Sequence, residues 1–212
     1  MSRKEYRFAP AGRMVVCIPA NPNFDVVALT ASAGGLHALS LVLAALPAAF
    51  AARLVVVQHL DRRHRSLMAD ILGRRTALPV REAREGDRLE PGVVFVAPPD
   101  HHLLVNHGGL LTLTQTELVH FVRPSADLLF ESTAASYGDR AIAVVLSGSG
   151  SDGAMGVKAI KKMGGTVVIQ DPKSCEFIGM PQAARDTGMV DFVLPLAQIA
   201  PALEKLVCAP VP

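Results

Sequence analysis

The sequence lacks the features that mark several protein classes. It has only three cysteines, with no C-x-x-C pair among them, so neither a disulfide framework nor a zinc cluster is indicated and a cytoplasmic setting is expected. The 21 Lys and Arg residues barely exceed the 19 Asp and Glu residues. This balance argues against a protein whose main work is neutralising nucleic-acid phosphates.

The sequence also lacks a membrane-spanning segment. Its longest apolar stretch, Leu39 to Val57, is broken by a serine, a proline and an arginine, whereas a span needs about 20 clean residues. The short apolar run at 14–20 follows basic residues but contains a proline and lacks a small-residue cleavage pattern. We expect neither a transmembrane helix nor a secretion signal.

What remains is the composition of one globular domain. Hydrophobic residues make up 50% of the 212 residues and charged residues 19%, which excludes a mainly disordered chain. We expect a flexible leader at 1–25, a single domain at 26–207 and a short tail at 208–212. No repeat or low-complexity segment interrupts this organisation.

Short β-branched runs alternate with amphipathic or Ala-rich segments along the domain, a pattern typical of βαβ units and a parallel sheet. The predicted strands are 26–30, 54–58, 93–97, 141–147, 166–170 and 191–194. The predicted helices are 36–46, 64–74, 125–137, 154–163, 181–186 and 196–207. Between them, strand-like runs at 103–106 and 110–115 flank an Asn-His-Gly-Gly turn, which predicts an antiparallel hairpin. The fold class is therefore α/β, a three-layer, doubly wound, mostly parallel sheet with a small hairpin insertion.

Three predicted strands end on residues that could carry chemistry. Ser32 lies in T-A-S-A-G-G, where a strand turns into a helix. It could be a nucleophile, or part of an anion-binding loop, or simply part of a tight turn. His59 ends V-V-V-Q-H and could be a base or a structural histidine. The six other histidines are expected mostly on surface loops or turns.

Asp152 lies in the third motif, S-G-S-G-S-D-G at 147–153. It could orient a histidine, or cap the helix predicted to follow it. Because the carboxyl ends of parallel strands meet at one edge, Ser32, His59 and Asp152 would converge there as nucleophile, base and orienting carboxylate. Backbone amides near Ala33 or in the 148–151 loop could hold an oxyanion.

These motifs together resemble the catalytic domain of the CheB protein-glutamate methylesterases. The resemblance covers about residues 26–207 and rests on T-A-S-A-G-G, V-V-V-Q-H, E-G-D-R-L-E-P-G, V-A-P-P-D, R-P-S-A-D-L-L-F, S-G-S-G-S-D-G-A and G-M-P. It implies a serine hydrolase with Ser32, His59 and Asp152 as its triad. It also implies as substrates the methylated glutamates, and sometimes the glutamines, of chemoreceptor cytoplasmic helices.

Four further residues are candidate neighbours of the triad. Ala33 and Ser149 could supply oxyanion or substrate contacts, and Arg123 could engage a substrate carboxylate or pack at a helix start. By the resemblance, Met180 in G-M-P would border the site, although it could equally pack in the core. The chain departs from the family in having Thr30 at the nucleophile turn and Ser149 where a methionine is usual. No metal and no organic cofactor is expected.

The alternatives differ in class. A catalytically weak module of the same fold could dock on a receptor or on a methyltransferase partner, although an intact triad argues against it. A nucleotide-binding domain would need a G-x-G-x-x-G loop, which is absent at the first turn. The family's usual phosphorylated receiver domain does not fit into 25 residues, so we expect hydrolysis that does not respond to phosphodonors.

Overall fold

The computed structural model describes residues 24–60, 63 and 66–208. The expected leader, apart from its last two residues, and all but the first residue of the expected tail lie outside the described residues. Within them, no helix is both long and apolar enough to cross a membrane.

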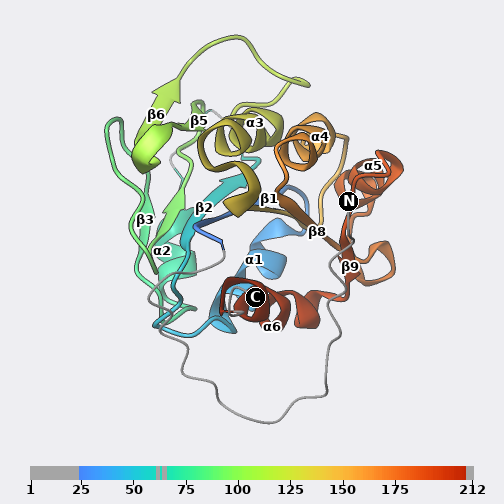
Figure 1. Cartoon of the computed structure of the whole chain (residues 1–212). Helices are drawn as coiled ribbons and strands as arrows, with labels where there is room; N and C mark the ends of the chain where they lie inside the picture. Colours follow the sequence, from blue (N-terminus) through green and yellow to red (C-terminus); the bar gives the residue numbers. More distant parts are fainter. Residues whose placement is uncertain (1–23, 61–62, 64–65, 209–212) are drawn as a thin grey trace.

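A seven-stranded sheet forms the middle of the molecule, with every neighbouring pair of strands parallel (Figure 1). The strand order is β3-β4-β2-β1-β7-β8-β9. The bounds are β1 Val26–Ala31, β2 Arg53–Gln58, β3 Val80–Glu82, β4 Val94–Val96, β7 Ala141–Val145, β8 Thr166–Gln170 and β9 Phe192–Leu194. All six residues of β1 and all five of β7 are buried, because a central parallel strand is covered on both faces and therefore reads as a continuous apolar run.

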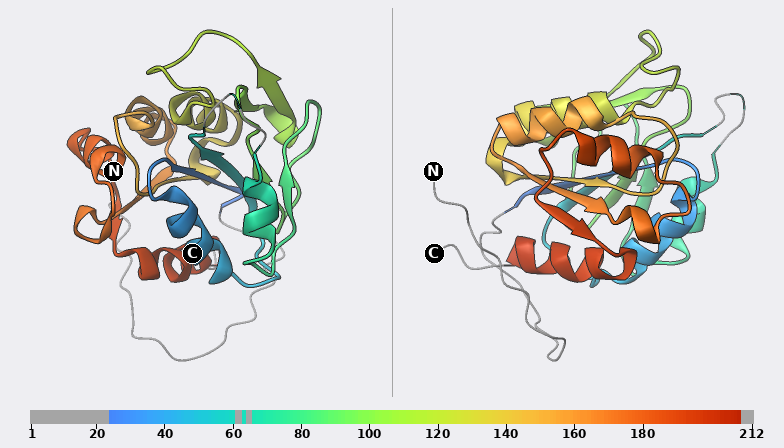
Figure 2. Two further views of the ribbon diagram at one scale, coloured as in Figure 1. Left: turned by 180° about the vertical axis from the view of Figure 1, so that it is seen from behind. Right: turned by 90° about the vertical axis from the view of Figure 1, so that its right-hand side faces the viewer.

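Helices cover both faces of the sheet, as the two views of Figure 2 show. On one face lie α1 (Gly35–Ala44), α2 (Met68–Gly73) and α6 (Leu196–Cys208), which share one hydrophobic core with the sheet. On the other lie α3 (Ala126–Tyr137), α4 (Ala154–Lys162) and α5 (Gly179–Asp186), which share a second core. The predicted three-layer α/β fold is confirmed.

The predicted antiparallel insertion is also present. Strands β5 (His102–Val105) and β6 (Leu111–Thr114) pair antiparallel, joined by the 3-10 turn η1 (His107–Gly109). The hairpin is fastened to α3, since the Val105 amide donates to Ser132 Oγ and Ser136 Oγ donates to the Val105 carbonyl. Two further 3-10 turns, η2 (Gly138–Arg140) and η3 (Pro172–Ser174), connect other elements.

The main differences between the structure and the sequence predictions are at three elements. Strand β3 was not predicted, because two of its three residues are exposed and it forms an edge with little apolar signal. Helix α2 begins at Met68, four residues after the predicted start, which lies outside the described residues. Helix α5 begins at Gly179, two residues before Pro181, since a proline is tolerated in the first turn of a helix.

Candidate active site

Three adjacent strands bring the candidate residues to one edge of the sheet. Strand β1 lies between β2 and β7, and the chain leaves β1 first toward β2 and later toward β7. Ligands of open parallel sheets bind outside the carboxyl ends of the strands at such a reversal of strand order. Ser32 follows β1, His59 follows β2, and the 147–153 loop follows β7, so the topology places all three candidate segments at this position.

Ser32 is held between its two neighbouring strands by its backbone. Its amide donates to the Ser147 carbonyl at 3.0 Å, and its carbonyl accepts from the Gly35 amide at 2.9 Å and from Gln58 Nε2 at 2.7 Å. The turn into α1 passes through Gly34, whose φ of 72° suits a residue without a Cβ. The backbone at Ser32 is thereby fixed by groups from α1, from β2 and from the loop after β7.

His59 and Asp152 form a direct pair. His59 Nε2 lies 2.8 Å from Asp152 Oδ2, with the two side chains 10% and 3% exposed. The His59 amide donates to the Ala31 carbonyl, which fixes the histidine beside the serine turn. With Nε2 bound to Asp152, Nδ1 is the ring nitrogen left to act toward Ser32. In the described chain Ser32 Oγ makes no hydrogen bond to His59, and such bonds often form only when substrate is bound.

Asp152 caps a helix, but not the one that the sequence suggested. Its Oδ1 accepts from Ser125 Oγ at 2.9 Å and from the Asp127 amide at 3.1 Å, and its Oδ2 accepts from the Ala126 amide at 2.6 Å. These donors begin α3, whereas α4, the helix that follows Asp152, has at its N-cap Gly153, which has no capping side chain. The capping expectation is therefore corrected: the tertiary structure brings the start of α3 to this carboxylate.

The caps are reciprocal. Asp127, in the first turn of α3, accepts the Gly156 amide of α4 on Oδ1 at 2.7 Å. Asp127 of α3 thus satisfies a free amide of α4, and Asp152, which lies just before α4, satisfies free amides of α3. The orienting carboxylate of the candidate triad is part of the joint between α3 and α4.

The fold shifts the pKa values of the two carboxylates in opposite directions. Burial by itself would raise the pKa of Asp152, but the hydrogen bond from His59 and those from the Ala126 and Asp127 amides outweigh it and leave the pKa lowered. Burial raises the pKa of Asp127, only partly opposed by the Gly156 amide, and the nearby negative charge of Asp152 adds to the rise. Asp152 is thus the carboxylate whose ionised form the fold favours.

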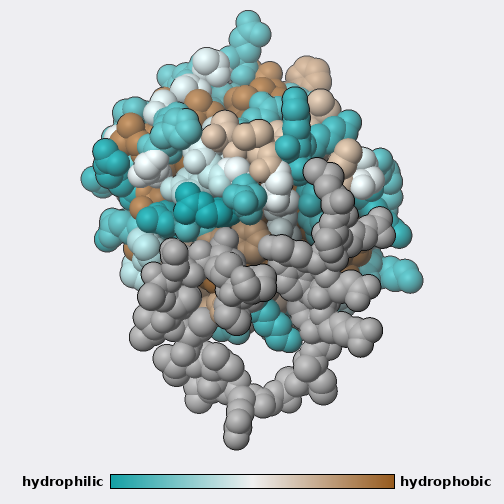
Figure 3. All heavy atoms as spheres, viewed as in Figure 1, coloured by the Kyte–Doolittle hydropathy of each residue, from teal (hydrophilic) through white to brown (hydrophobic). Residues whose placement is uncertain are grey.

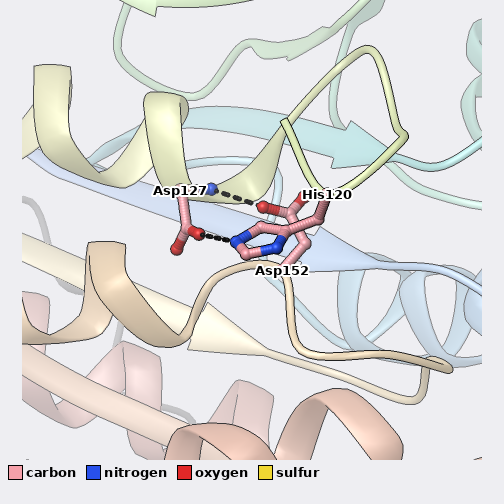
Figure 4. Close-up of side chains that lie close together, drawn as sticks. All are labelled: His120, Asp127 and Asp152. Carbon is pink, nitrogen blue, oxygen red and sulfur yellow. Dashed lines mark hydrogen bonds and ion pairs between the residues drawn. The ribbon is translucent and has the colours of Figure 1, made fainter. Parts of the chain in front are cut away.

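A third side chain adjoins this pair. His120 Nε2 lies 3.1 Å from Asp127 Oδ2, and Figure 4 shows the imidazole beside both carboxylates. Ligand atoms of His120, Asp127 and Asp152 lie within 4.8 Å of one another. Three of the four carboxylate oxygens, however, already accept hydrogen bonds from other groups of the protein, so the cluster fits mutual helix capping better than cation binding.

His102 is an exception to the expectation that the other histidines lie mostly on surface loops or turns. It is fully buried, not on a surface loop, because the hairpin packs it against α3. Its Nε2 lies 2.9 Å from the Glu117 carbonyl, and its Nδ1 accepts from the Ser125 amide at 3.1 Å. Burial lowers the pKa of His102, so the neutral ring with hydrogen on Nε2 braces the serine that contacts Asp152.

Arg123 is engaged by the protein itself. Its Nε and Nη2 donate to Asp100 Oδ1 at 3.1 and 2.7 Å, and its Nη1 donates to the Gln115 and Thr116 carbonyls. Four of its five N–H groups are thereby used. These contacts tie Arg123 to Asp100 and to the 115–116 segment, and they leave no free bidentate face for a substrate carboxylate.

The other predicted neighbours lie around the serine. Ala33 is half-buried and Ser149 is exposed. Within the described residues, neither of their amides donates to a protein acceptor. Met180 is buried in the second core, and its amide donates to the Gly148 carbonyl at 2.9 Å. A Cβ added at Gly148 would collide with Met180 Sδ and lie 2.9 Å from Ser32 Cβ. Met180 therefore packs directly against the backbone of the 147–153 loop.

Sequence reasoning did not single out Gln58. This side chain is 4% exposed, and its Nε2 donates to both the Ser32 and the His59 carbonyls, at 2.7 and 3.0 Å. It therefore ties the candidate nucleophile's backbone to the candidate base's backbone. A buried glutamine directly before a strand-end histidine was the available signal, since buried polar groups need specific partners.

Comparison with known proteins agrees with this fold. A family model described as CheB methylesterase matches residues 27–203. The crystal structure of the CheB methylesterase catalytic domain from Thermotoga maritima is similar at a TM-score of 0.83 and 35% sequence identity, covering 87% of this chain and 99% of that one.

Two relatives are similar to this chain over a comparable share of its length. A protein-glutamate methylesterase/protein-glutamine glutaminase of Anaeromyxobacter dehalogenans is 47% identical over 186 residues, which is 87% of this chain and 54% of the relative. A Leptospira interrogans protein, to which the same pair of activities is provisionally ascribed, is 39% identical over 178 residues, which is 84% of this chain and 92% of that protein. This protein belongs to the CheB methylesterase family.

Proposed function

We propose that the protein is a protein-glutamate methylesterase that uses Ser32, His59 and Asp152 as its catalytic triad. The observation that carries the proposal is the buried His59–Asp152 pair beside the Ser32 turn, at the carboxyl edge of the sheet. Relatives named protein-glutamate methylesterase/protein-glutamine glutaminase, matched over most of this chain, support the same chemistry.

The reaction follows from the groups present. Ser32 Oγ attacks the γ-carbonyl of an esterified glutamate while His59 Nδ1 takes the hydroxyl proton. Asp152, ionised and bound to Nε2, stabilises the imidazolium. The proton then passes to the leaving methoxy group, methanol departs and an acyl-enzyme remains. Water repeats the sequence and releases the glutamate carboxylate.

Two backbone amides suit the developing negative charge. The Ala33 amide follows Ser32 in the chain, and the Ser149 amide follows Gly148, where an added Cβ would lie 2.9 Å from Ser32 Cβ. Within the described residues neither amide has a protein acceptor. Amides held by the fold stabilise an oxyanion without reorganising. The same acyl-enzyme would form from a glutamine side chain with loss of ammonia, which gives the second activity in the relatives' names.

The finer assignment of substrate follows from the family. We propose methylated glutamates on the cytoplasmic helices of chemoreceptors, or of a similar signalling protein, and a cytoplasmic location for the enzyme. A weakly catalytic module that docks on a receptor or on a methyltransferase is the competing assignment.

Methanol release is the direct test. The purified protein is incubated with a methylated receptor fragment and with N-acetylglutamate γ-methyl ester, and methanol is measured with and without enzyme. Release from both substrates is the expected result. Binding of the receptor fragment without release of methanol from either substrate would favour the docking module.

A further inference from the structure

A strained tight turn lies at the edge of the candidate active site. Val119 and Val122 exchange both backbone hydrogen bonds, at 3.2 and 2.9 Å, with His120 and Phe121 between them at φ values of 49° and 64°. Two-residue turns with positive φ at both positions are normally filled by Asn, Asp and Gly. A bulky side chain such as Phe121 in this conformation is an outlier that costs free energy.

The Phe121 ring is not packed into the part of the fold that the structure describes. Phe121 is 91% exposed, the most exposed of the large hydrophobic residues in the described part of the chain. The turn itself is firmly attached, because His120 pairs with Asp127 and Arg123 is tied to Asp100 and to two backbone carbonyls. The protein therefore holds an aromatic ring in water at a fixed place, at a conformational cost.

That place is next to the proposed base. Phe121 lines a small pocket of about 60 Å³ together with His59, Leu60, Val122 and Arg123. The loop between β6 and α3 projects beyond the helical layer in Figures 1 and 2. Hydrophobic residues also gather among hydrophilic ones at the top of Figure 3, where this loop lies in Figure 1.

We propose that Phe121 is a specificity-determining residue that contacts the polypeptide flanking the esterified glutamate, and so selects protein substrates over small esters. The proposal rests on the proposed function. A methyl-esterified side chain offers few atoms of its own, so recognition of a protein must come from its neighbours along the chain. Of the described residues that line the pocket, Leu60, Phe121 and Val122 are apolar and Arg123 is neutralised by Asp100. The exposed Leu118 lies on the same loop, so the contact that these residues offer is apolar.

The occupant is therefore an apolar side chain of the substrate protein close to the modified glutamate. Aromatic residues, Phe among them, are enriched in the cores of protein interfaces, and a ring that is already held in position loses little conformational entropy on contact. The turn strain is consistent with this assignment, because strained backbone persists where function requires a particular presentation.

The test compares two substrates and three variants. Asparagine tolerates positive φ, so Phe121→Asn removes the ring and keeps the turn, whereas Phe121→Leu keeps an apolar group. Met163→Ala is the matched control, since Met163 is also exposed but lies at the far end of α4. Steady-state methanol release is measured on a methylated receptor fragment and on N-acetylglutamate γ-methyl ester, with thermal melting as the check of folding.

We expect Phe121→Asn to lower kcat/KM for the protein substrate at least tenfold, mainly through KM, and to leave the small ester within about twofold. Phe121→Leu should recover part of the loss, and Met163→Ala should match the wild type. Equal losses on both substrates, or no loss on the protein, would overturn the proposal. So would a dimeric wild type that Phe121→Asn converts to a monomer, because a second copy would then be the occupant. If the wild type releases methanol from neither substrate, the proposed function is refuted instead.

Discussion

At the scale of single residues, Asp152 combines two tasks that are usually separate. Its carboxylate binds His59 and also satisfies the free amides at the start of α3. Ser125, braced by the neutral His102, adds a hydroxyl donor. Both oxygens of Asp152, including the Oδ2 that binds His59, therefore also hold the start of α3 in place.

Ser32→Ala should abolish ester hydrolysis while the protein stays folded. The Oγ makes no hydrogen bond within the described residues, so its loss removes the nucleophile without removing a structural contact. We expect a fall in kcat of several orders of magnitude, measured as methanol release. Ser151→Ala, an exposed serine of the 147–153 loop, is the control. If Ser32→Ala kept more than about a tenth of the activity, the nucleophile would lie elsewhere.

Asp152→Asn should cost both activity and stability. From the sequence alone this variant is expected to keep its cap, because an amide can cap the helix that follows. In the structure both oxygens accept hydrogen bonds, and Oδ1 and Oδ2 each face an α3 amide, so the Asn NH₂ group must point at a donor. We expect about 1–3 kcal/mol less free energy of unfolding, measured by urea denaturation, with a large fall in kcat. Unchanged stability would contradict the capping role.

At the scale of elements, the joint between α3 and α4 sets the position of Asp152. The two helices approach closely at Gly156, where an added Cβ would lie 2.5 Å from Phe130 Cβ and 3.0 Å from the Asp127 carbonyl oxygen. Neither neighbour can yield without moving a backbone. The distance between the helices, and with it the orientation of the triad carboxylate, depends on this glycine.

Gly156→Ala should therefore destabilise the protein although alanine is the better helix former. We expect overpacking to lower the free energy of unfolding by about 1–3 kcal/mol, measured by urea denaturation, together with a reduced rate of ester hydrolysis. Lys158→Ala, an exposed change in the same helix, is the control and should stay within about 0.5 kcal/mol. A Gly156→Ala protein more stable than wild type would show that α3 and α4 separate freely.

At the scale of the whole molecule, the buried carboxylates give opposite contributions to the pH dependence of stability. The pKa of Asp152 is lowered on folding, so its contribution is present above the unfolded value of about 3.9 and is lost as pH falls through the folded value. The pKa of Asp127 is raised. Its contribution is fully present below the unfolded value and is lost as pH rises through the folded one.

Asp127→Asn should therefore gain on the wild type as pH rises. The asparagine oxygen can still accept the Gly156 amide, and the variant no longer places a second negative charge beside Asp152. We expect the difference in free energy of unfolding, variant minus wild type, to shift in favour of the variant between about pH 3.5 and pH 7, measured by urea denaturation at both values. A shift in the opposite direction would mean that the ionised Asp127 is the form stabilised on folding.

The sequence by itself determined the alternation of strands and helices, the parallel sheet with its hairpin, and the presence of Ser32 and His59 at strand ends. These follow from local patterns, because apolar periodicity and turn residues are set by neighbours along the chain. It missed β3, whose three residues form an edge strand only because β4 pairs with them.

Only the tertiary structure decided what the polar side chains do. Asp152 caps α3 and not α4, His102 is buried and neutral, and Arg123 is bound to Asp100, because each of these partners is at least 20 residues away along the chain. Hydrogen-bond partners at such separations depend on how the layers pack, which no local pattern records. The position of the exposed and strained Phe121 also depends on the tertiary structure. It lies beside His59 because of the way its loop packs, and its neighbours in the sequence do not indicate this.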